Sequence, residues 1–201
     1  MGRLTLIFTV LYTSVVQPKQ PTATSNHICF QAVNKVCQDI VKLSPHIKLD
    51  DAYRYSNAFV RVARRYKIPV QLLVSIAKQE SNFRLGVVRT VKGLIQTEDG
   101  DWVAGQVGSD FCMMQINAAN ITHFKMDASK LTTEPEVCIE AGARILASAR
   151  KFENKEPAWW TRYNAVSDIH REIYQQHILK HWRKIDPAVD ALMCQAKVAT
   201  L

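Results

Sequence analysis

The stretch PVQLLVSIAKQES, Pro69 to Ser81, decides how this chain is interpreted. Proline is favoured at the first position of a helix, and the apolar residues behind it recur at helical spacing. The face formed by Leu73, Ile76 and Ala77 continues, one turn further on, to Glu80. The sequence therefore predicts a helix over residues 69–81 that carries an acid at the end of its apolar stripe.

The surroundings predicted for Glu80 favour the protonated acid. An apolar face removes water from the carboxylate, and the C-terminal end of a helix disfavours a negative charge. A carboxylic acid that keeps its proton near neutral pH can act as a general acid. The alternative is a glutamate turned to water and paired with Arg84, four residues on. This helix alone favours the alternative, and the motifs further along the chain reverse that preference.

The composition fits one globular domain with an excess of positive charge. The chain has 201 residues, of which 47% are hydrophobic, and a net charge of +8, so it can bury a sizeable core. A basic surface suits an anionic partner such as a nucleic acid, a membrane surface or an acidic polymer of the cell envelope. The one dense basic cluster is Arg61, Arg64, Arg65 and Lys67. Because no nucleic-acid-binding motif is present, we expect no nucleic-acid partner.

The N-terminus has the pattern of an export signal. Arg3 precedes an apolar run, Leu4 to Tyr12, and small or polar residues follow. The run resembles a short signal peptide and is too short for a membrane-spanning helix; a buried N-terminal segment is the alternative. We expect a signal peptide and linker over 1–25, an N-terminal helical extension over 26–49, and the main domain over 50–201. The protein is then located in the periplasm or cell envelope.

Five cysteines in an exported chain predict at least one disulfide, and the odd count leaves at least one thiol unpaired or paired between chains. Cys29 and Cys37 cannot pair if one helix holds both, because roughly 12 Å would separate them. We expect a bridge that uses Cys138 or Cys194, and a bond between those two would tie the C-terminal tail to the domain.

Periodicity and turn signals predict a mainly helical chain interrupted by one hairpin. Glu98 to Asp101, with its Asp-Gly pair, predicts a turn between strands over about Lys92 to Val107. Asp50 and Asp51 are expected to cap a helix over 52–66. Further helices are expected over 28–43, 133–152, 158–164 and 168–183, and from Pro187 onward.

Four motifs in order carry a resemblance to a known family. They are Glu80-Ser81, GSDFCMMQIN over 108–117, AGARIL over 141–146, and RYNA over 162–165 after two tryptophans. With this spacing the chain, from about Tyr53 to Trp182, resembles the soluble lytic transglycosylase domain, above all the small exported members that accompany conjugation and secretion machines. The resemblance implies a mainly α, lysozyme-like fold with a small β-hairpin.

The resemblance also implies the reaction and its residues. Glycan strands of peptidoglycan would be cleaved between N-acetylmuramic acid and N-acetylglucosamine, with a 1,6-anhydro ring formed and no metal or organic cofactor. Glu80 would be the catalytic acid and base, and five residues would surround the substrate: Ser81, Met114, Gln115, Tyr163 and Asn164. Ser81 would support the carboxylate, Met114 and Gln115 would line the groove, Tyr163 would bond near Glu80 or the acetamido group, and Asn164 would shape the groove. Core packing is the alternative for Met114 or its neighbour Met113, and for Tyr163.

Two positions depart from the family pattern, since Cys112 and Val166 stand where the resembled family often has glycine. Both departures concern the shape of the groove, and neither removes a catalytic group. His177 and His181, one turn apart, lack an evident third ligand, so we expect no metal site.

Two other functions remain open. The first is a goose-type-like muramidase that hydrolyses the bond with water and needs a second carboxylate, for which Glu98, Asp99, Asp101 and Asp110 are the candidates. The second is an inactive glycan-binding scaffold component of a secretion or conjugation machine.

Overall fold

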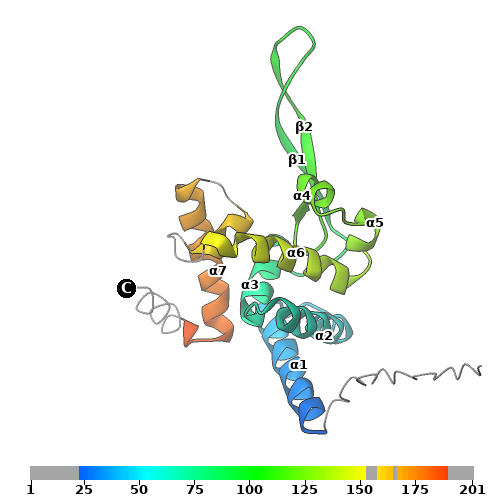
Figure 1. Ribbon diagram of the computed structural model, residues 1–201, viewed down its shortest axis with the longest axis vertical. Coiled ribbons are helices and arrows are strands. Elements are labelled where there is room, and N and C mark those ends of the chain that lie inside the picture. Colours follow the sequence, from blue (N-terminus) through cyan, green and yellow to red (C-terminus); the bar gives the residue numbers. More distant parts are fainter. Residues whose placement is uncertain (1–22, 153–157, 165–166, 190–201) are drawn as a thin grey trace, which may run out of the picture.

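The structure, a computed structural model, describes residues 23–152, 158–164 and 167–189 (Figure 1). The helices are α1 (Ala23–Leu43), α2 (Leu49–Tyr66), α3 (Val70–Ser81), α4 (Ala118–His123), α5 (Ala128–Leu131), α6 (Pro135–Ala149) and α7 (Asp168–Ile185), with short 3-10 helices η1 (Arg150–Phe152) and η2 (Trp159–Tyr163). The strands are β1 (Val88–Gln96), β2 (Trp102–Phe111) and β3 (Ile116–Asn117). None of the described helices has an apolar stretch long enough to cross a membrane.

Helix α3 lies at the centre of the helical body and is packed against α1, α2, α6 and α7. Every residue from Leu72 to Ala77 is buried, all round the helix. A helix that is apolar on all sides belongs in a core, and this burial fixes where the end of α3 points. The helix ends at Asn82, which has the left-handed conformation (φ 57°) and donates its backbone N–H to Lys78 O at 3.0 Å.

Helices α2 and α6 lie side by side, and two residues of the basic cluster form ion pairs between them. Arg61 pairs with Glu136, and Arg65 pairs with Glu140 at 2.6 Å. The phenol of Tyr66 donates to the second oxygen of Glu140 at 2.9 Å. Two of the four basic residues therefore serve helix packing, which weakens the cluster as a binding surface.

The three strands form an antiparallel sheet in the order β1-β2-β3. Its first two strands pair from Val88–Phe111 to Gln96–Trp102, with a register shift at Val91/Lys92. The resulting hairpin projects well beyond the helices (Figure 1). At its tip, Gly100 adopts a φ of 88°, a conformation open to glycine.

The predicted elements are present, with corrected ends. Strands reach Val88 and Phe111, beyond the expected 92–107, because pairing continues down to the helical body. Helix α2 begins at Leu49 with Lys48 as its cap, so Asp50 and Asp51 lie in the first turn. Pro69 is likewise the cap of α3 and not its first residue. Helix α1 begins at Ala23, inside the stretch expected to be a linker. Four expected features lie outside the described residues: positions 1–22 of the signal peptide and linker expected over 1–25, Val166, Cys194, and the part beyond residue 189 of the helix expected from Pro187.

Candidate active site

An open cleft of about 680 Å³ lies at the end of α3, where α7 and the base of β1 meet it. Its lining residues come from these three elements and from the segment before α7: Gln79, Glu80, Arg89, Asn164, Ser167, His170, Ile173, Tyr174 and His177. Glu80 is the only acid among the described residues that line this cleft. The end of the buried helix thus presents a single carboxylate to an open groove.

Two side chains from the second half of the chain bind the Glu80 carboxylate. The phenol of Tyr174 on α7 donates to Glu80 Oε1 at 2.7 Å, and Asn164 Nδ2 donates to the same oxygen at 3.4 Å. Asn164 was expected at the groove, and it lies there. Tyr174 was missed. On α7 Tyr174 shares a buried face with Arg171 and Ile178, at helical spacing. That spacing could have predicted that Tyr174 is buried, but not that it binds a residue 94 positions away.

Burial raises the pKa of the Glu80 carboxyl above its usual value. The hydrogen bonds from Tyr174 and Asn164 and the positive charge of Arg89 oppose this rise, while the negative charge of Asp110 adds to it. Removal from water is the largest of these effects. The site therefore favours a protonated acid that has a ready donor for the carboxylate once the proton leaves.

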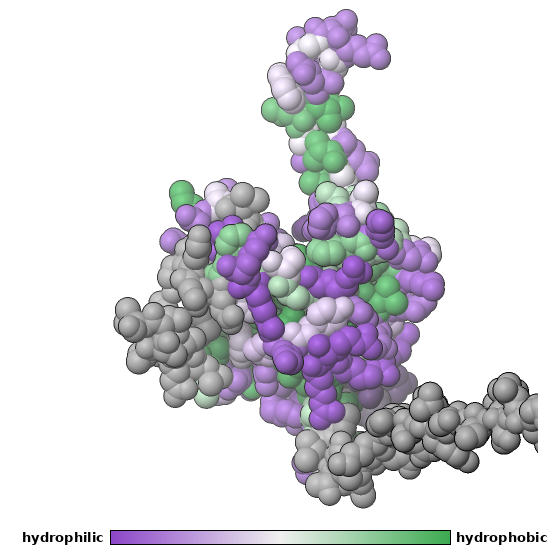
Figure 2. Space-filling view, in the orientation of Figure 1, coloured by the Kyte–Doolittle hydropathy of each residue, from purple (hydrophilic) through white to green (hydrophobic). Residues whose placement is uncertain are grey.

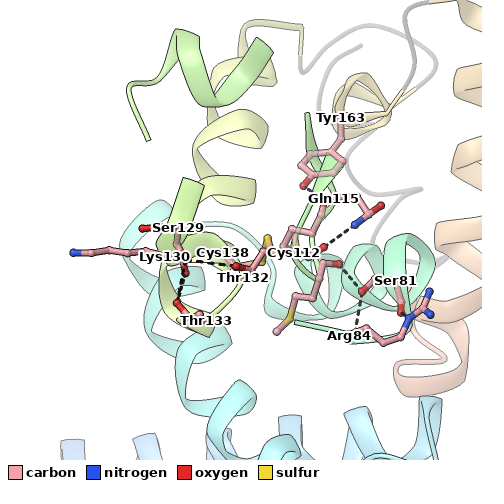
Figure 3. The surroundings of a disulfide bond; sticks show 12 residues. Ser81, Arg84, Cys112, Gln115, Ser129, Lys130, Thr132, Thr133, Cys138 and Tyr163 are labelled. Carbon is pink, nitrogen blue, oxygen red and sulfur yellow. Dashed lines mark hydrogen bonds between the residues drawn. A yellow bond between two sulfur atoms is a disulfide. The ribbon is translucent and has the colours of Figure 1, made fainter. Parts of the chain in front are cut away.

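A tight turn over Cys112 to Gln115 lies next to Ser81, the residue that follows Glu80 (Figure 3). Its carbonyls accept from both sides: Met113 O accepts from Ser81 Oγ at 2.9 Å, and Met114 O accepts from the Tyr163 phenol at 2.6 Å. Ser81 follows Glu80 directly, so this bond ties the end of α3 to the turn. Ser81 thus contacts the turn, whereas it was expected to support the carboxylate.

The structure corrects the expected placement of three groove residues. Met114 is fully buried, as is Met113, so both methionines pack in the core, whereas core packing was expected for only one of them. The Gln115 side chain is 9% exposed and donates to Cys112 O at 2.9 Å. Tyr163 bonds Met114 O and not Glu80, and burial together with the nearby charges of Glu80 and Asp110 raises its pKa well above the usual value. None of the three lines the cleft, and their polar atoms already have partners in the turn.

Cys112 forms a disulfide with Cys138 at the start of α6, with Cα atoms 6.1 Å apart (Figure 3). Use of Cys138 was expected, but a bond to Cys194 was the expected pairing that would tie down the tail. Cys112 has a φ of 62°, in the left-handed region that favours glycine. This explains why a glycine suits the position in the resembled family, and the bridge compensates for the strain of a side chain there. Cys37 is buried with a free thiol on α1, the helix that also contains Cys29.

Asp110 lies behind the cleft with both oxygens engaged. It is 8% exposed, pairs with Arg89 at 3.0 Å, and accepts from Asn117 Nδ2 at 3.2 Å. These contacts join all three strands at the base of the hairpin. Glu98, Asp99 and Asp101 lie at the far tip of the hairpin, away from the cleft.

The histidine pair on α7 is joined to α3 through one amide. Gln79 Oε1 lies 3.1 Å from His181 Nε2, and Gln79 Nε2 lies 3.4 Å from His177 Nδ1. Within the described ranges, no three His, Cys, Asp or Glu side chains are grouped closely enough to hold a metal ion. The pair therefore helps to fix α7 beside the end of α3.

The chain was compared with known families, curated proteins and solved structures. The Transglycosylase SLT domain family matches residues 57–182, more than half of the chain. Neither a curated protein nor a solved structure gave a significant match. The matched range begins in α2 and ends in α7, so it contains Glu80, the turn over 112–115, Asn164 and Tyr174. By this match and by its mainly helical, lysozyme-like fold with a small antiparallel sheet, the chain belongs to the SLT-domain family, whose members act on peptidoglycan as lytic transglycosylases.

Proposed function

We propose that this protein cleaves the β-1,4 bond between N-acetylmuramic acid and N-acetylglucosamine and leaves a 1,6-anhydro ring on the muramic residue. The observation that carries the proposal is Glu80: a half-buried acid with a raised pKa, and the one carboxyl group among the described residues lining the cleft. A hydrolase of the usual kind uses two carboxyl groups at the bond. A single acid suits a reaction in which the substrate supplies its own nucleophile.

In the first step Glu80 acts as an acid. Its proton passes to the glycosidic oxygen, the bond from that oxygen to C1 of muramic acid breaks, and N-acetylglucosamine leaves with a new hydroxyl group. Positive charge develops at C1, where the substrate's acetamido oxygen can stabilise it. The Glu80 carboxylate left behind accepts from Tyr174, which offsets the desolvation of the new charge.

In the second step the same carboxylate acts as a base. It takes the proton of the muramic C6 hydroxyl while that oxygen bonds to C1, which closes the ring and restores the acid. No water is consumed, so the two products together have the mass of the substrate. The proton returns to the group that gave it, and one residue completes the cycle.

The roles proposed for the neighbouring residues follow from their contacts. Asn164 lies in the cleft within reach of a sugar, and we assign it to substrate binding. Ser81, Met114, Gln115 and Tyr163 act indirectly, since the bonds from Ser81 and Tyr163 fix the carbonyls of the turn next to the end of α3. Arg89, held by Asp110, supplies positive charge at the rim for the anionic groups of peptidoglycan.

Digestion of purified sacculi, followed by mass analysis of the fragments, tests the proposal. The wild type should release muropeptides that lack a reducing muramic end and are lighter by one water than muramidase products. Glu80→Gln should lose at least ~100-fold in rate, because the proton donor is gone and the shape is kept. Glu98→Gln serves as the matched control, since it makes the same change at the hairpin tip, outside the lining of the cleft.

The two alternatives predict different results. A muramidase would give mainly reducing ends, and Asp110→Asn or Asp101→Asn would then abolish them. An inactive glycan-binding protein would release no fragments, although it would sediment with the sacculi.

We further propose that the protein is exported and opens the wall locally for an envelope-spanning secretion or conjugation machine. The Arg3 and Leu4–Tyr12 pattern and the resemblance to exported members support this role. N-terminal sequencing of protein recovered from the periplasm tests export. A mature N-terminus at Met1, or recovery from the cytoplasm alone, would contradict it.

A further inference from the structure

The hairpin extends beyond the rest of the fold as an arm, which we define as residues 92–107. The helical body lies at one end of the arm and the acidic turn at the other (Figure 1). Figure 2 shows hydrophobic residues along the shaft of the arm and hydrophilic residues at its tip. A two-stranded hairpin is marginal in water unless one of its faces is covered. The arm therefore has both the exposed surface and the physical reason to acquire a partner.

The register of the strands separates the two faces of the arm. Directly paired residues share a face, and neighbours along a strand alternate. One face, the Leu94 face, consists of the pairs Lys92–Gln106, Leu94–Ala104 and Gln96–Trp102. The opposite face consists of Gly93–Gly105 and Ile95–Val103, together with Val107 at the bulge.

The opposite face packs on itself. A Cβ atom added to Gly105 would meet Ile95 Cδ1 at 2.5 Å, and one added to Gly93 would meet Val107 Cγ1 at 2.8 Å. The two long side chains thus fill the space that the glycines leave, which covers part of their apolar surface. On the Leu94 face, by contrast, Leu94 and Trp102 are 64% and 63% exposed. Ile95, Val103 and Val107 on the opposite face are 40%, 42% and 51% exposed, so the Leu94 face holds the two most exposed of the large apolar side chains of the arm.

Charge along the arm changes sign from base to tip. Lys92 lies at the end next to the body, while Glu98, Asp99 and Asp101 lie at the tip, with Leu94 and Trp102 between them. None of these four charged residues has an ion-pair partner in the part of the chain that the structure describes. Two arms laid side by side in opposite directions would therefore place the acidic tip of each next to the basic base of the other.

We propose that two copies of this chain associate through their Leu94 faces, antiparallel and about a two-fold axis. The acidic tip of each arm then meets Lys92 and the basic body of the other copy, since the chain carries a net +8 in spite of its three tip acids. The axis runs across the strands near Leu94 and Ala104, so that Leu94 of one arm lies against Leu94 of the other. An isologous contact of this kind closes on itself and forms a dimer, not a filament.

A membrane is a less suitable partner for the same surface. Insertion of the arm would carry three carboxylates into the bilayer ahead of the apolar residues, and charged groups are expensive there. A partner surface made of an identical arm keeps those carboxylates in water beside positive charge. The order of the residues along the arm therefore favours protein over lipid.

Sedimentation velocity of the full chain, over a range of concentrations at low salt, tests the dimer. The arm is small compared with a standard protein interface, so we expect a monomer–dimer equilibrium with a Kd of roughly 1–100 µM. Leu94→Ser combined with Trp102→Ser should raise that Kd at least ~10-fold. Leu49→Ser is the matched control, because Leu49 is 68% exposed on α2 and lies outside the arm.

Charge reversal separates this arrangement from general stickiness. Glu98→Lys, Asp99→Lys and Asp101→Lys together should weaken the dimer, most strongly at low salt. Adding Lys92→Glu to that variant should restore part of the affinity, because tip and base are again complementary. Unchanged thermal unfolding of all these variants confirms folding, since the arm lies outside the core.

Three results would overturn the proposal: a wild type that stays monomeric up to high concentration, a dimer that survives the loss of Leu94 and Trp102, or a dimer that is indifferent to the charge reversals. Flotation with vesicles of phosphatidylethanolamine and phosphatidylglycerol tests whether the protein binds lipid. Arm-dependent flotation of a protein that is monomeric in solution would assign the surface to membranes instead.

Discussion

Removal of the Cys112–Cys138 bridge should destabilise the fold by an amount that the chain connectivity sets. The two cysteines are 26 residues apart, and loop-closure entropy for that separation gives about 3.5 kcal/mol at 25 °C. For a chain of this size, that free energy corresponds to a fall in Tm of about 7–14 °C. Cys112→Ala with Cys138→Ala removes the bridge and leaves no unpaired thiol at either position.

A second variant uses the backbone of the turn as an internal check. Because Cys112 has a φ of 62°, alanine there retains a strain of roughly 1 kcal/mol that glycine lacks. Cys112→Gly with Cys138→Ala should therefore unfold at a Tm about 2–4 °C above that of the double-alanine variant. The two variants lack the same bridge, so their difference reports the conformation of residue 112 alone.

Thermal unfolding followed by circular dichroism, with and without a reductant, measures both effects. Cys37→Ala is the control, because that buried thiol is free. The change in Tm caused by this substitution should be the same with and without reductant. A double-alanine variant as stable as the oxidised wild type would refute the bridge. Equal stability of the glycine and alanine variants would refute the left-handed turn.

Three further results are expected. Glu80→Gln should be more stable than wild type, and the difference in Tm should grow as the pH rises through the Glu80 pKa, because the raised pKa means that ionisation disfavours the fold; a constant difference between acid and alkaline pH would contradict this. Tyr174→Phe should lower kcat roughly 10-fold and move the alkaline limb of the pH–rate profile upward, since the lost donor stabilised the Glu80 anion; a profile that moves downward would contradict that role. Burial, aided by the charge of Lys78, lowers the pKa of His181 from 6.5 to about 4, so its contribution to stability is complete above pH 6.5 and is lost as the pH falls towards 4; His181→Gln should flatten the wild-type loss of Tm over that interval.

The sequence was sufficient to predict the elements whose physics is local. Helical periodicity from Leu72 to Ala77 predicted α3 and put Glu80 at its end, and both are found. The Asp-Gly pair at the hairpin tip predicted the turn, and Gly100 has the positive φ that such a turn requires. These features depend only on residues that are close in sequence, so a single sequence is enough to predict them.

Contacts between distant segments were beyond the same reasoning. Nothing local marks Tyr174 as the donor to Glu80, because the bond depends on how α7 packs across α3. The partner of Cys138 was open for the same reason: the separation of two cysteines in sequence gives no distance in space. Met114 and Tyr163 were expected at the groove by resemblance, whereas in the structure Met114 is buried and its carbonyl accepts from Tyr163, so neither lines the cleft.

The separation of Glu80 from its donor also has a consequence for the timing of activity. Tyr174 and Asn164 follow Glu80 by 94 and 84 residues, so a chain still being synthesised contains the acid long before it contains either partner. Contacts across such distances are slow to form because the intervening loop must close first. The cleft is therefore absent from nascent and unfolded chains. Latency of this kind needs no inhibitor, since the site is incomplete until α7 packs against α3.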